Sequence, residues 1–295
     1  MRKPVPSWWG YPHPRKAPRH CISTISANPT PAPSVRHMEL KGTSAVVTGG
    51  ASGLGEATAI LLAERGVRVV LADLERQAEK GDALANKIGG AFVPCDVTNT
   101  EQVQAAVDAA VEMAPLWSLA NCAGMGFAAR TIDKNGVPAD LEWYTRIINV
   151  NLVGSFNCLR LAASAMNKNT PDGDGCRGAV VNVASVAAFD GQIGQAAYAS
   201  SKGGVVSMTL VTARDLSAAG IRVNCIAPGL IDTPIYGTGE ASEQFKAALG
   251  KSVLFPPRLG HASEFASMCV ELLSNSYMNG ETIRVDGGIR MPPKS

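Results

Sequence analysis

The chain has 295 residues, of which 46% are hydrophobic and 18% charged, so it is long and apolar enough to build a large globular core. Residues 1–38 carry six bases and no acid, which leaves the rest of the chain acidic and argues against a nucleic-acid partner. Seven scattered cysteines without a CxxC pair indicate neither a disulfide framework nor a zinc site, and no apolar run approaches the ~20 residues of a membrane-spanning helix.

The amino-terminal stretch differs from the rest, because eight of the 18 prolines lie within residues 1–38. Prolines at that density favour an extended, unpacked chain, so we expect a disordered basic extension at residues 1–37 and one folded domain at residues 38–295. Irregularly spaced histidines there predict no metal site. The expected location is the cytoplasm. The alternative is the mitochondrial matrix, if the stretch is a targeting peptide, although its prolines would break the amphipathic helix of such a peptide.

From residue 43 onward, short β-branched runs alternate with longer helical patterns. The predicted strands are residues 43–48, 67–73, 91–96, 117–124, 178–185, 221–229 and 281–287. The helical patterns include residues 53–66, a polar segment to about residue 88, and residues 100–113, 152–167 and 196–218. Strands joined in this way pair in parallel through right-handed crossovers. The predicted fold is α/β, a single-domain Rossmann-type doubly wound sheet of seven parallel strands with helices on both faces.

The first predicted strand leads into TGGASGLG, residues 48–55, where the pattern changes from strand to helix. Gly49, Gly53 and Gly55 would let the backbone turn tightly and approach a pyrophosphate, which the free N–H groups at the start of a helix favour. Asp73 ends the next strand 18 residues after Gly55, where its carboxylate can accept both ribose hydroxyls of an adenosine and would repel a 2′-phosphate. This combination predicts a dinucleotide site that takes NAD rather than NADP.

A tyrosine and a lysine lie at i and i+4 in YASSK, residues 198–202, and would share one face of a helix. A free phenol, with a pKa near ~10, holds its proton at neutral pH, and we expect the Lys202 ammonium to lower the pKa of Tyr198 and make it a usable acid or base. Ser185 ends the fifth predicted strand, where its hydroxyl could hydrogen-bond a substrate oxygen. Alone, such a serine would more ordinarily cap a helix or turn.

These motifs, together with NCAG at residues 121–124, resemble the short-chain dehydrogenase/reductase family in type and order. Cys122 stands where that family usually has a second asparagine, and the thiol is small enough to fit there. Longer stretches are similar to the branch of this family that acts on 3-hydroxyacyl-CoA, and they comprise residues 184–204, 226–234, 255–260 and 279–291 with the polar insert 169–178.

The resemblance implies a catalytic set of Asn151, Ser185, Tyr198 and Lys202. In it, Lys202 also binds the nicotinamide ribose, and Asn151 holds a water for proton relay; a helix-kink residue is the alternative for Asn151. The expected cofactor-binding residues are Gly49, Ser52, Gly53, Leu54, Gly55, Asp73, Asp96, Val97, Asn121, Ala123, Gly124, Tyr198, Lys202, Pro228, Gly229 and Thr233. Of these, Asp96 and Val97 are implied to contact the adenine, and Thr233 to contact the nicotinamide end.

Substrate choice has weaker signals. Residues 235–255 are rich in Gly, Ser and Ala and predict a lid over an apolar pocket. Gln192 and Gln195 could contact a thioester or keto oxygen beside Ser185 and Tyr198, or could equally only cap the loop. The predicted reaction is reversible, NAD-dependent oxidation of a secondary alcohol, by resemblance a 3-hydroxyacyl-CoA or 2-methyl-3-hydroxyacyl-CoA. A hydroxysteroid or small-alcohol dehydrogenase and a cofactor-binding scaffold without turnover are the alternatives.

The helical patterns at residues 152–167 and 196–218 are apolar or small on most sides, which is more than one sheet face can cover. We therefore expect burial against another subunit, and the resemblance implies a homotetramer. Cys225 and Cys269 fall in apolar surroundings and are predicted to fill the core.

Overall fold

A computed structural model describes residues 38–294 apart from residues 127 and 238. The predicted extension at residues 1–37 lies outside the described residues, so its role and the cytoplasmic location of the protein stay predictions. Among the described residues, no helix combines the length and the hydropathy that crossing a bilayer requires.

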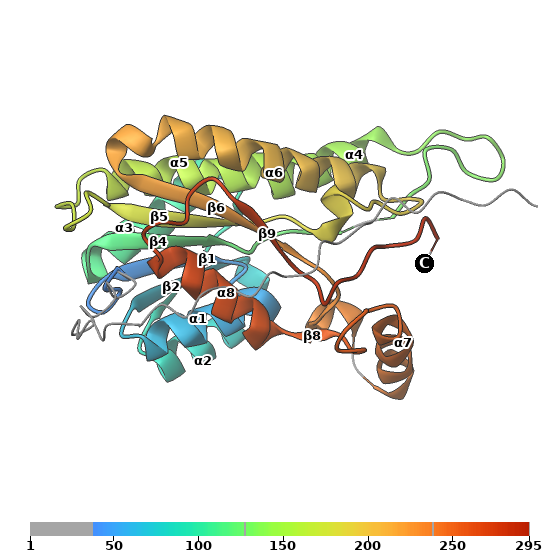
Figure 1. Cartoon of the computed structure of the whole chain (residues 1–295), viewed down its shortest axis with the longest axis horizontal. Coiled ribbons are helices and arrows are strands. Elements are labelled where there is room, and N and C mark those ends of the chain that lie inside the picture. Colours follow the sequence, from blue (N-terminus) through green and yellow to red (C-terminus); the bar gives the residue numbers. More distant parts are fainter. Residues whose placement is uncertain (1–37, 127, 238, 295) are drawn as a thin grey trace, which may run out of the picture. The chain divides into compact units, whose positions relative to one another are not determined.

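Seven parallel strands form the central sheet in the order β3-β2-β1-β4-β5-β6-β9 (Figure 1). Their bounds are β1 Ser44–Thr48, β2 Arg68–Asp73, β3 Ala91–Pro94, β4 Leu116–Asn121, β5 Gly178–Val183, β6 Ile221–Pro228 and β9 Thr282–Val285. Each coincides with a predicted strand, which confirms the doubly wound sheet. The strand order reverses between β1 and β4, and ligands of such sheets bind in the crevice at the carboxyl ends of the strands there.

Helices cover both faces of the sheet (Figure 1). Their bounds are α1 Gly53–Glu64, α2 Ala78–Ile88, α3 Thr100–Met113, α4 Leu141–Ile148, α5 Gly154–Met166, α6 Ala196–Asp215, α7 Glu240–Gly250 and α8 Ala262–Ser274. Local sequence explains the limits of α3, because the Asn99 side chain caps its first turn by accepting from the Gln102 amide (2.9 Å), and the buried residues recur every three or four positions. The helices predicted at residues 53–66, 100–113 and 196–218 are confirmed to within a few residues.

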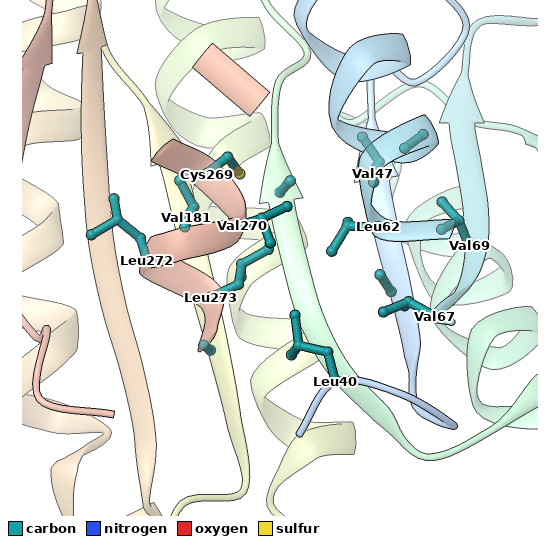
Figure 2. Packing of buried hydrophobic residues seen from close by; sticks show 14 of the residues in the cluster. Leu40, Val47, Leu62, Val67, Val69, Val181, Cys269, Val270, Leu272 and Leu273 are labelled. Carbon is teal, nitrogen blue, oxygen red and sulfur yellow. The ribbon is translucent and has the colours of Figure 1, made fainter. Parts of the chain in front are cut away.

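The core has two layers, one on each side of the sheet. Alternate residues of β1 point to opposite faces, so that Val47 packs with α1 and α8 while Val46 packs with α3 and α5. Figure 2 shows the first layer, where Leu62 of α1 and Leu273 of α8 lie over the strands. All five residues of β1 are buried, as expected for a strand covered on both sides.

The segment after β6 differs from the expectation drawn from its composition. Residues predicted as a Gly-, Ser- and Ala-rich lid contain the helix α7, flanked by a short parallel pair of β7 Ile231–Asp232 and β8 Gly260–His261. Gly250 is the one buried residue of α7, so this helix stands apart from the main core. Lys246 on α7 pairs with Asp232 (3.0 Å) and so ties the helix to β7.

Candidate active site

The strands carry the predicted site residues at their carboxyl ends. β1 ends at Thr48 before the glycine-rich loop, β2 ends at Asp73, β4 ends at Asn121 and β6 ends at Pro228, while Ser185 follows β5 by two residues. Because all seven strands are parallel, these ends share one edge of the sheet. The structure therefore brings together residues that are up to 180 positions apart in the sequence.

The glycine-rich loop leaves its backbone open to a ligand. Gly49 and Gly53 have φ angles of 63° and 55°, in the left-handed region that favours glycine. A side chain at Gly49 would approach the Ala123 backbone to 3.0 Å. Ser52 is the N-cap of α1 but makes no side-chain cap hydrogen bond, so that side chain leaves the first N–H groups of α1 available for an anionic group.

The carboxylate of Asp73 is aimed at this loop. It accepts from the Ala51 amide (3.1 Å) and from the Leu74 amide (2.8 Å). An ionised carboxylate has about four lone-pair positions, so two stay available for ribose hydroxyls. Uncapped backbone N–H groups beside a half-exposed carboxylate fit the pyrophosphate and ribose of a nicotinamide dinucleotide.

Asp96 and Val97 follow Asp73 along the same edge, since the Cys95 amide donates to the Asp73 carbonyl (2.7 Å). The Asp96 carboxylate accepts from the amide and hydroxyl of Thr98, and thereby shapes the turn before α3. Val97 is buried, and its carbonyl accepts from the Asn157 side chain (2.9 Å). Both residues support the local packing, and their contact with an adenine ring stays a prediction.

The NCAG segment connects the glycine-rich loop with the catalytic residues. The Ala123 amide donates to the Thr48 hydroxyl (3.0 Å), and a side chain at Gly124 would come within 3.4 Å of the Lys202 ammonium. Asn121 lies deeper than its predicted adenosine role requires. It is buried, and its amide donates to the Ser155 carbonyl and to Asn182 Oδ1, both at 3.0 Å, so it ties β4 to β5 and α5.

Tyr198 and Lys202 share one face of α6, as their spacing predicts. Lys202 Nζ lies 5.8 Å from the centre of the Tyr198 ring and donates to the Val183 carbonyl at the end of β5 (2.8 Å). The Ser185 hydroxyl accepts from the Ala187 amide (3.1 Å) and lies near enough to Tyr198 to oppose the rise in the pKa of that phenol. A serine hydroxyl and a phenol therefore point at the same place, where both can contact one substrate oxygen.

Asn151 lies in a π-helical turn, Asn149–Val153, between α4 and α5. Its side chain accepts from the Met125 amide (2.8 Å) and donates to the Met125 carbonyl (2.9 Å) and to the Ser201 hydroxyl (3.0 Å). A side chain added at Gly124 would contact both Asn151 and Lys202, so these two side chains lie against the same stretch of backbone. Asn151 is thus both at a helix irregularity and next to Lys202.

Burial dominates the ionisation of the pair. It raises the pKa of Tyr198, against the opposing hydrogen bond with Ser185, and lowers the pKa of Lys202 to about 8. The predicted lowering of the Tyr198 pKa by Lys202 is wrong for this arrangement, because the ammonium is directed at the Val183 carbonyl and both groups are removed from water. The phenol therefore holds its proton at neutral pH and is ready to donate it.

The predicted nicotinamide end is assembled from β6, β9 and the loop after β6. Pro228 ends β6, and the Gly229 amide donates to the Val285 carbonyl (2.9 Å). Thr233 lies beside the glycine-rich loop, since a side chain at Gly53 would lie 3.4 Å from its Cβ. Thr233 therefore lies next to the glycine-rich loop, and its contact with the nicotinamide end stays a prediction.

Gln192 and Gln195 bond to one another and to the carboxyl-terminal segment. Gln192 Nε2 donates to the Pro292 carbonyl (3.1 Å), and the Gln195 side chain accepts from the Gln192 backbone amide (3.0 Å). These contacts match the alternative in which both residues stabilise the loop. Sequence reasoning missed Met125, Ser201 and the Val183 carbonyl. Only Ser201 had a signal, because it lies within YASSK, whereas backbone partners have none.

The cysteines near the site are protonated thiols. Burial raises the pKa of Cys122 to about 12 and that of Cys225 to about 11, and it raises the pKa of Cys269 as well. Cys225 and Cys269 are fully buried in the apolar clusters, which confirms them as core residues. Within the described part of the chain, no group of His, Cys, Asp and Glu side chains is arranged to hold a metal ion.

A family model described as enoyl-(acyl carrier protein) reductase matches residues 49–290. With the fold, the glycine-rich loop and the Ser185, Tyr198 and Lys202 arrangement, this match shows that the chain belongs to the short-chain dehydrogenase/reductase family. It is an oxidoreductase of a family that uses nicotinamide cofactors.

Individual relatives narrow the comparison. The chain is 49% identical to 3-hydroxyacyl-CoA dehydrogenase type-2 of Drosophila melanogaster over 86% of this chain and 100% of that protein. It is 47% identical to the protein of the same name from Homo sapiens, over 86% of this chain and 97% of that one. The crystal structure of 3-hydroxyacyl-CoA dehydrogenase type-2 from Mycobacterium avium superimposes with a TM-score of 0.82 at 45% identity, covering 86% of this chain and 98% of that chain.

Proposed function

We propose that the chain catalyses the reversible, NAD-dependent oxidation of a secondary alcohol at C3 of a short or branched 3-hydroxyacyl-CoA. The observation that carries the proposal is the convergence of Ser185, Tyr198 and Lys202 beside the glycine-rich loop. The names of relatives that are 45–49% identical over 86% of the chain support an acyl-CoA substrate.

The residues of the site divide the work of the reaction. A bound nicotinamide would supply the hydride acceptor. In oxidation, the phenolate form of Tyr198 takes the proton of the substrate hydroxyl, while the Ser185 hydroxyl hydrogen-bonds the same oxygen and stabilises its developing charge. Lys202, with a pKa of about 8, is able to exchange a proton near neutrality and lies against Gly124 next to Asn151. In reduction, the protonated phenol of Tyr198 donates to the ketone oxygen.

Asp73 supports NAD over NADP as the cofactor. Its carboxylate lies at the end of β2 and is held by the Ala51 and Leu74 amides. A 2′-phosphate placed on the neighbouring ribose would meet a fixed negative charge, with no base at Ala51 or Leu74 to neutralise it.

A substrate panel followed by the absorbance of NADH tests the function. We expect acetoacetyl-CoA to be reduced with NADH far faster than with NADPH, and faster than steroid ketones. A preference for steroid ketones would favour the hydroxysteroid alternative, and no NADH-dependent rate with any ketone would favour a scaffold without turnover. Tyr198→Phe should lose activity while still binding NADH, and near-full activity of that variant would contradict the mechanism.

We also propose that the chain assembles into a homotetramer through the outer faces of α5 and α6. Exposed apolar side chains gather there, and they are Val153, Phe156, Leu210 and Val211. A groove of about 340 Å³ runs between the two helices, lined by Phe156, Leu159, Ala163 and Leu216 among others. Exposed apolar surface of this kind marks protein interfaces.

Light scattering of the intact protein tests this assembly. Phe156→Glu should yield smaller species, because a charge would enter the apolar groove. Phe245→Glu is the matched control, since that aromatic side chain is 54% exposed on α7, which stands apart from the main core, and it should leave the assembly unchanged. A monomeric wild-type protein would contradict the proposal.

A further inference from the structure

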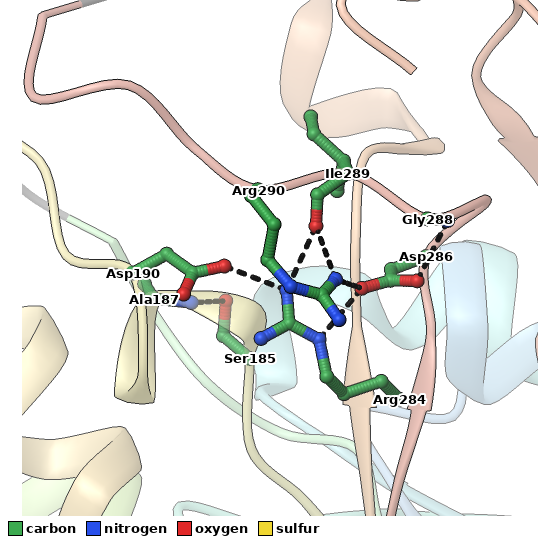
Figure 3. Close-up of polar contacts among 8 residues, drawn as sticks. All are labelled: Ser185, Ala187, Asp190, Arg284, Asp286, Gly288, Ile289 and Arg290. Atoms are coloured by element: carbon green, nitrogen blue, oxygen red, sulfur yellow. Dashed lines mark hydrogen bonds and ion pairs between the residues drawn. The ribbon is translucent and has the colours of Figure 1, made fainter. Parts of the chain in front are cut away.

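Charged contacts join the carboxyl-terminal segment to the loop that precedes the catalytic tyrosine (Figure 3). Arg284 on β9 donates through Nη2 to Asp190 Oδ2 (2.6 Å) and through Nε to Asp286 Oδ2 (2.7 Å). The same Nη2 donates to the Ile289 carbonyl (2.9 Å), and the guanidinium lies 5.5 Å from the centre of the Phe189 ring. One arginine therefore holds residues that are 94 positions apart in the sequence.

The ion pair of Arg284 and Asp190 is shielded from water. The two side chains are 20% and 19% exposed, so solvent and salt screen their attraction less than that of a surface pair. The hydrogen bond from Arg284 is the main reason that the pKa of Asp190 lies below its usual range. The Asp190 carboxylate is thus ionised and held in place at any pH near neutrality.

Asp190 lies in the loop between Ser185 and Tyr198. Its amide donates to the Val186 carbonyl (2.9 Å), and the Ala188 amide donates to the Ser185 carbonyl (3.0 Å). These bonds join Asp190 to the short 3-10 helix Val186–Ala188, whose N-cap is Ser185. A displacement of Asp190 would therefore move the turn that orients the Ser185 hydroxyl.

The other end of the contact is anchored at the predicted nicotinamide end of the site. Asp286 packs against Gly229, where an added side chain would come within 2.7 Å of the Asp286 Cβ. The Gly229 amide donates to the Val285 carbonyl (2.9 Å), so β9 and the end of β6 move together. Arg284 thus joins two walls of the site, the turn after Ser185 and the turn after Pro228.

We infer that Arg284 is a positioning residue of the active site: through Asp190 it holds the turn after β5 so that Ser185 and Tyr198 meet the same substrate oxygen. This inference rests on the proposed function, because it assigns Arg284 a task in that reaction. A small displacement of catalytic groups costs far more in rate than in cofactor binding, since the rate depends on near-attack geometry.

Four variants and one control test the inference at a temperature well below the lowest melting temperature. They are Arg284→Gln, Arg284→Lys, Asp190→Asn and the double variant Arg284→Gln/Asp190→Asn, with Arg290→Gln as control. Arg290 is a suitable control because it also donates to Asp286 Oδ2 (3.2 Å), but its side chain is 64% exposed. We expect kcat for NADH-dependent reduction of acetoacetyl-CoA to fall about tenfold or more in each single variant, and no further in the double variant.

Cofactor binding separates positioning from general damage. The Kd for NADH, from fluorescence titration, should change by less than about twofold in all variants, and Arg290→Gln should keep the wild-type kcat. Arg284→Lys should recover part of kcat, because it keeps the charge but offers no planar fork for both carboxylates. If Arg284→Gln does not fold, the kcat of Asp190→Asn alone tests the inference, because this substitution only replaces one oxygen by nitrogen.

Two results would overturn the inference. One is wild-type kcat in Arg284→Gln or Asp190→Asn, and the other is a double variant whose loss equals the product of the single losses. Failure of the proposed function looks different, because the wild-type protein would then reduce no ketone or would be unaffected by Tyr198→Phe. A wild-type protein that needs Tyr198 but tolerates Arg284→Gln would sink the positioning role alone.

Discussion

The buried ammonium of Lys202 should destabilise the folded chain, although the proposed reaction requires it. Lys202 is 5% exposed, and burial lowers its pKa from 10.5 to about 8. Since one pKa unit corresponds to about 1.4 kcal/mol, the charged form of Lys202 destabilises the folded chain by about 3 kcal/mol at neutral pH. Replacing Lys202 by Met removes this cost, together with the hydrogen bond to the Val183 carbonyl, which contributes about 1 to 2 kcal/mol.

We therefore predict that Lys202→Met raises the free energy of unfolding by about 1 to 2 kcal/mol at pH 7 while abolishing turnover. The gain depends on pH. Because the pKa is lower in the folded than in the unfolded chain, the unfolded chain binds the extra proton between about pH 8 and 10.5, and wild-type stability rises with pH across that window. The advantage of the variant should accordingly disappear by about pH 10.

Urea unfolding followed by circular dichroism, at one protein concentration and at pH 7 and pH 10, measures this difference. Lys251→Met is the matched control, because Lys251 is exposed and should show no such gain. A variant less stable than the wild type at pH 7 with an unchanged m-value would refute the reasoning. A stability difference of the same size at both pH values would refute it as well.

Three further predictions concern the cofactor and the proton. Asp73→Asn should narrow the preference for NADH over NADPH by about tenfold or more, since it removes the charge that repels a 2′-phosphate; the ratio of kcat/KM values measures it, and an unchanged ratio would contradict it. Gly55→Ala should weaken NADH binding in a fluorescence titration, because its Cβ would clash with the Gly49 carbonyl oxygen. Gly173→Ala is the control, because a Cβ there would meet open space. If Gly55→Ala and Gly173→Ala bind NADH with equal affinity, the assignment of the glycine-rich loop to the cofactor is contradicted. Alcohol oxidation should rise from pH 7 to pH 9 while ketone reduction stays level, because burial raises the pKa of Tyr198 above its ordinary value of 10, so that the phenolate fraction grows while the phenol remains the main form; a kcat/KM for oxidation that does not rise, or one for reduction that falls, would contradict Tyr198 as the proton carrier.

Much of the fold could be predicted because its strands are buried on both faces. Such strands appear in the sequence as short continuous apolar runs, as in β1, where Val46 and Val47 enter opposite core layers. The helix α7 could not be predicted in the same way. It buries only Gly250, so no apolar stripe marks it in the sequence.

The candidate site likewise has features that the sequence predicts and features that it does not. Tyr198 and Lys202 are neighbours through helical spacing, and the glycine-rich loop lies at a visible change from strand to helix, so local rules predict both. The ionisation of the pair could not be predicted, because burial is the main cause of the shifted pKa values of Tyr198 and Lys202, and the ammonium of Lys202 is directed at the Val183 carbonyl. Backbone carbonyls carry no sequence signal.

The sequence alone thus determined the parallel sheet, the glycine-rich loop followed by Asp73, and the helical pairing of Tyr198 with Lys202, because each follows from a local pattern of residue types. Only the tertiary structure decided which contacts Gln192 and Gln195 make, how deep Asn121 lies, and that Arg284 reaches Asp190. These outcomes depend on which segments the sheet order places side by side, and contacts across 94 positions leave no periodicity in the chain.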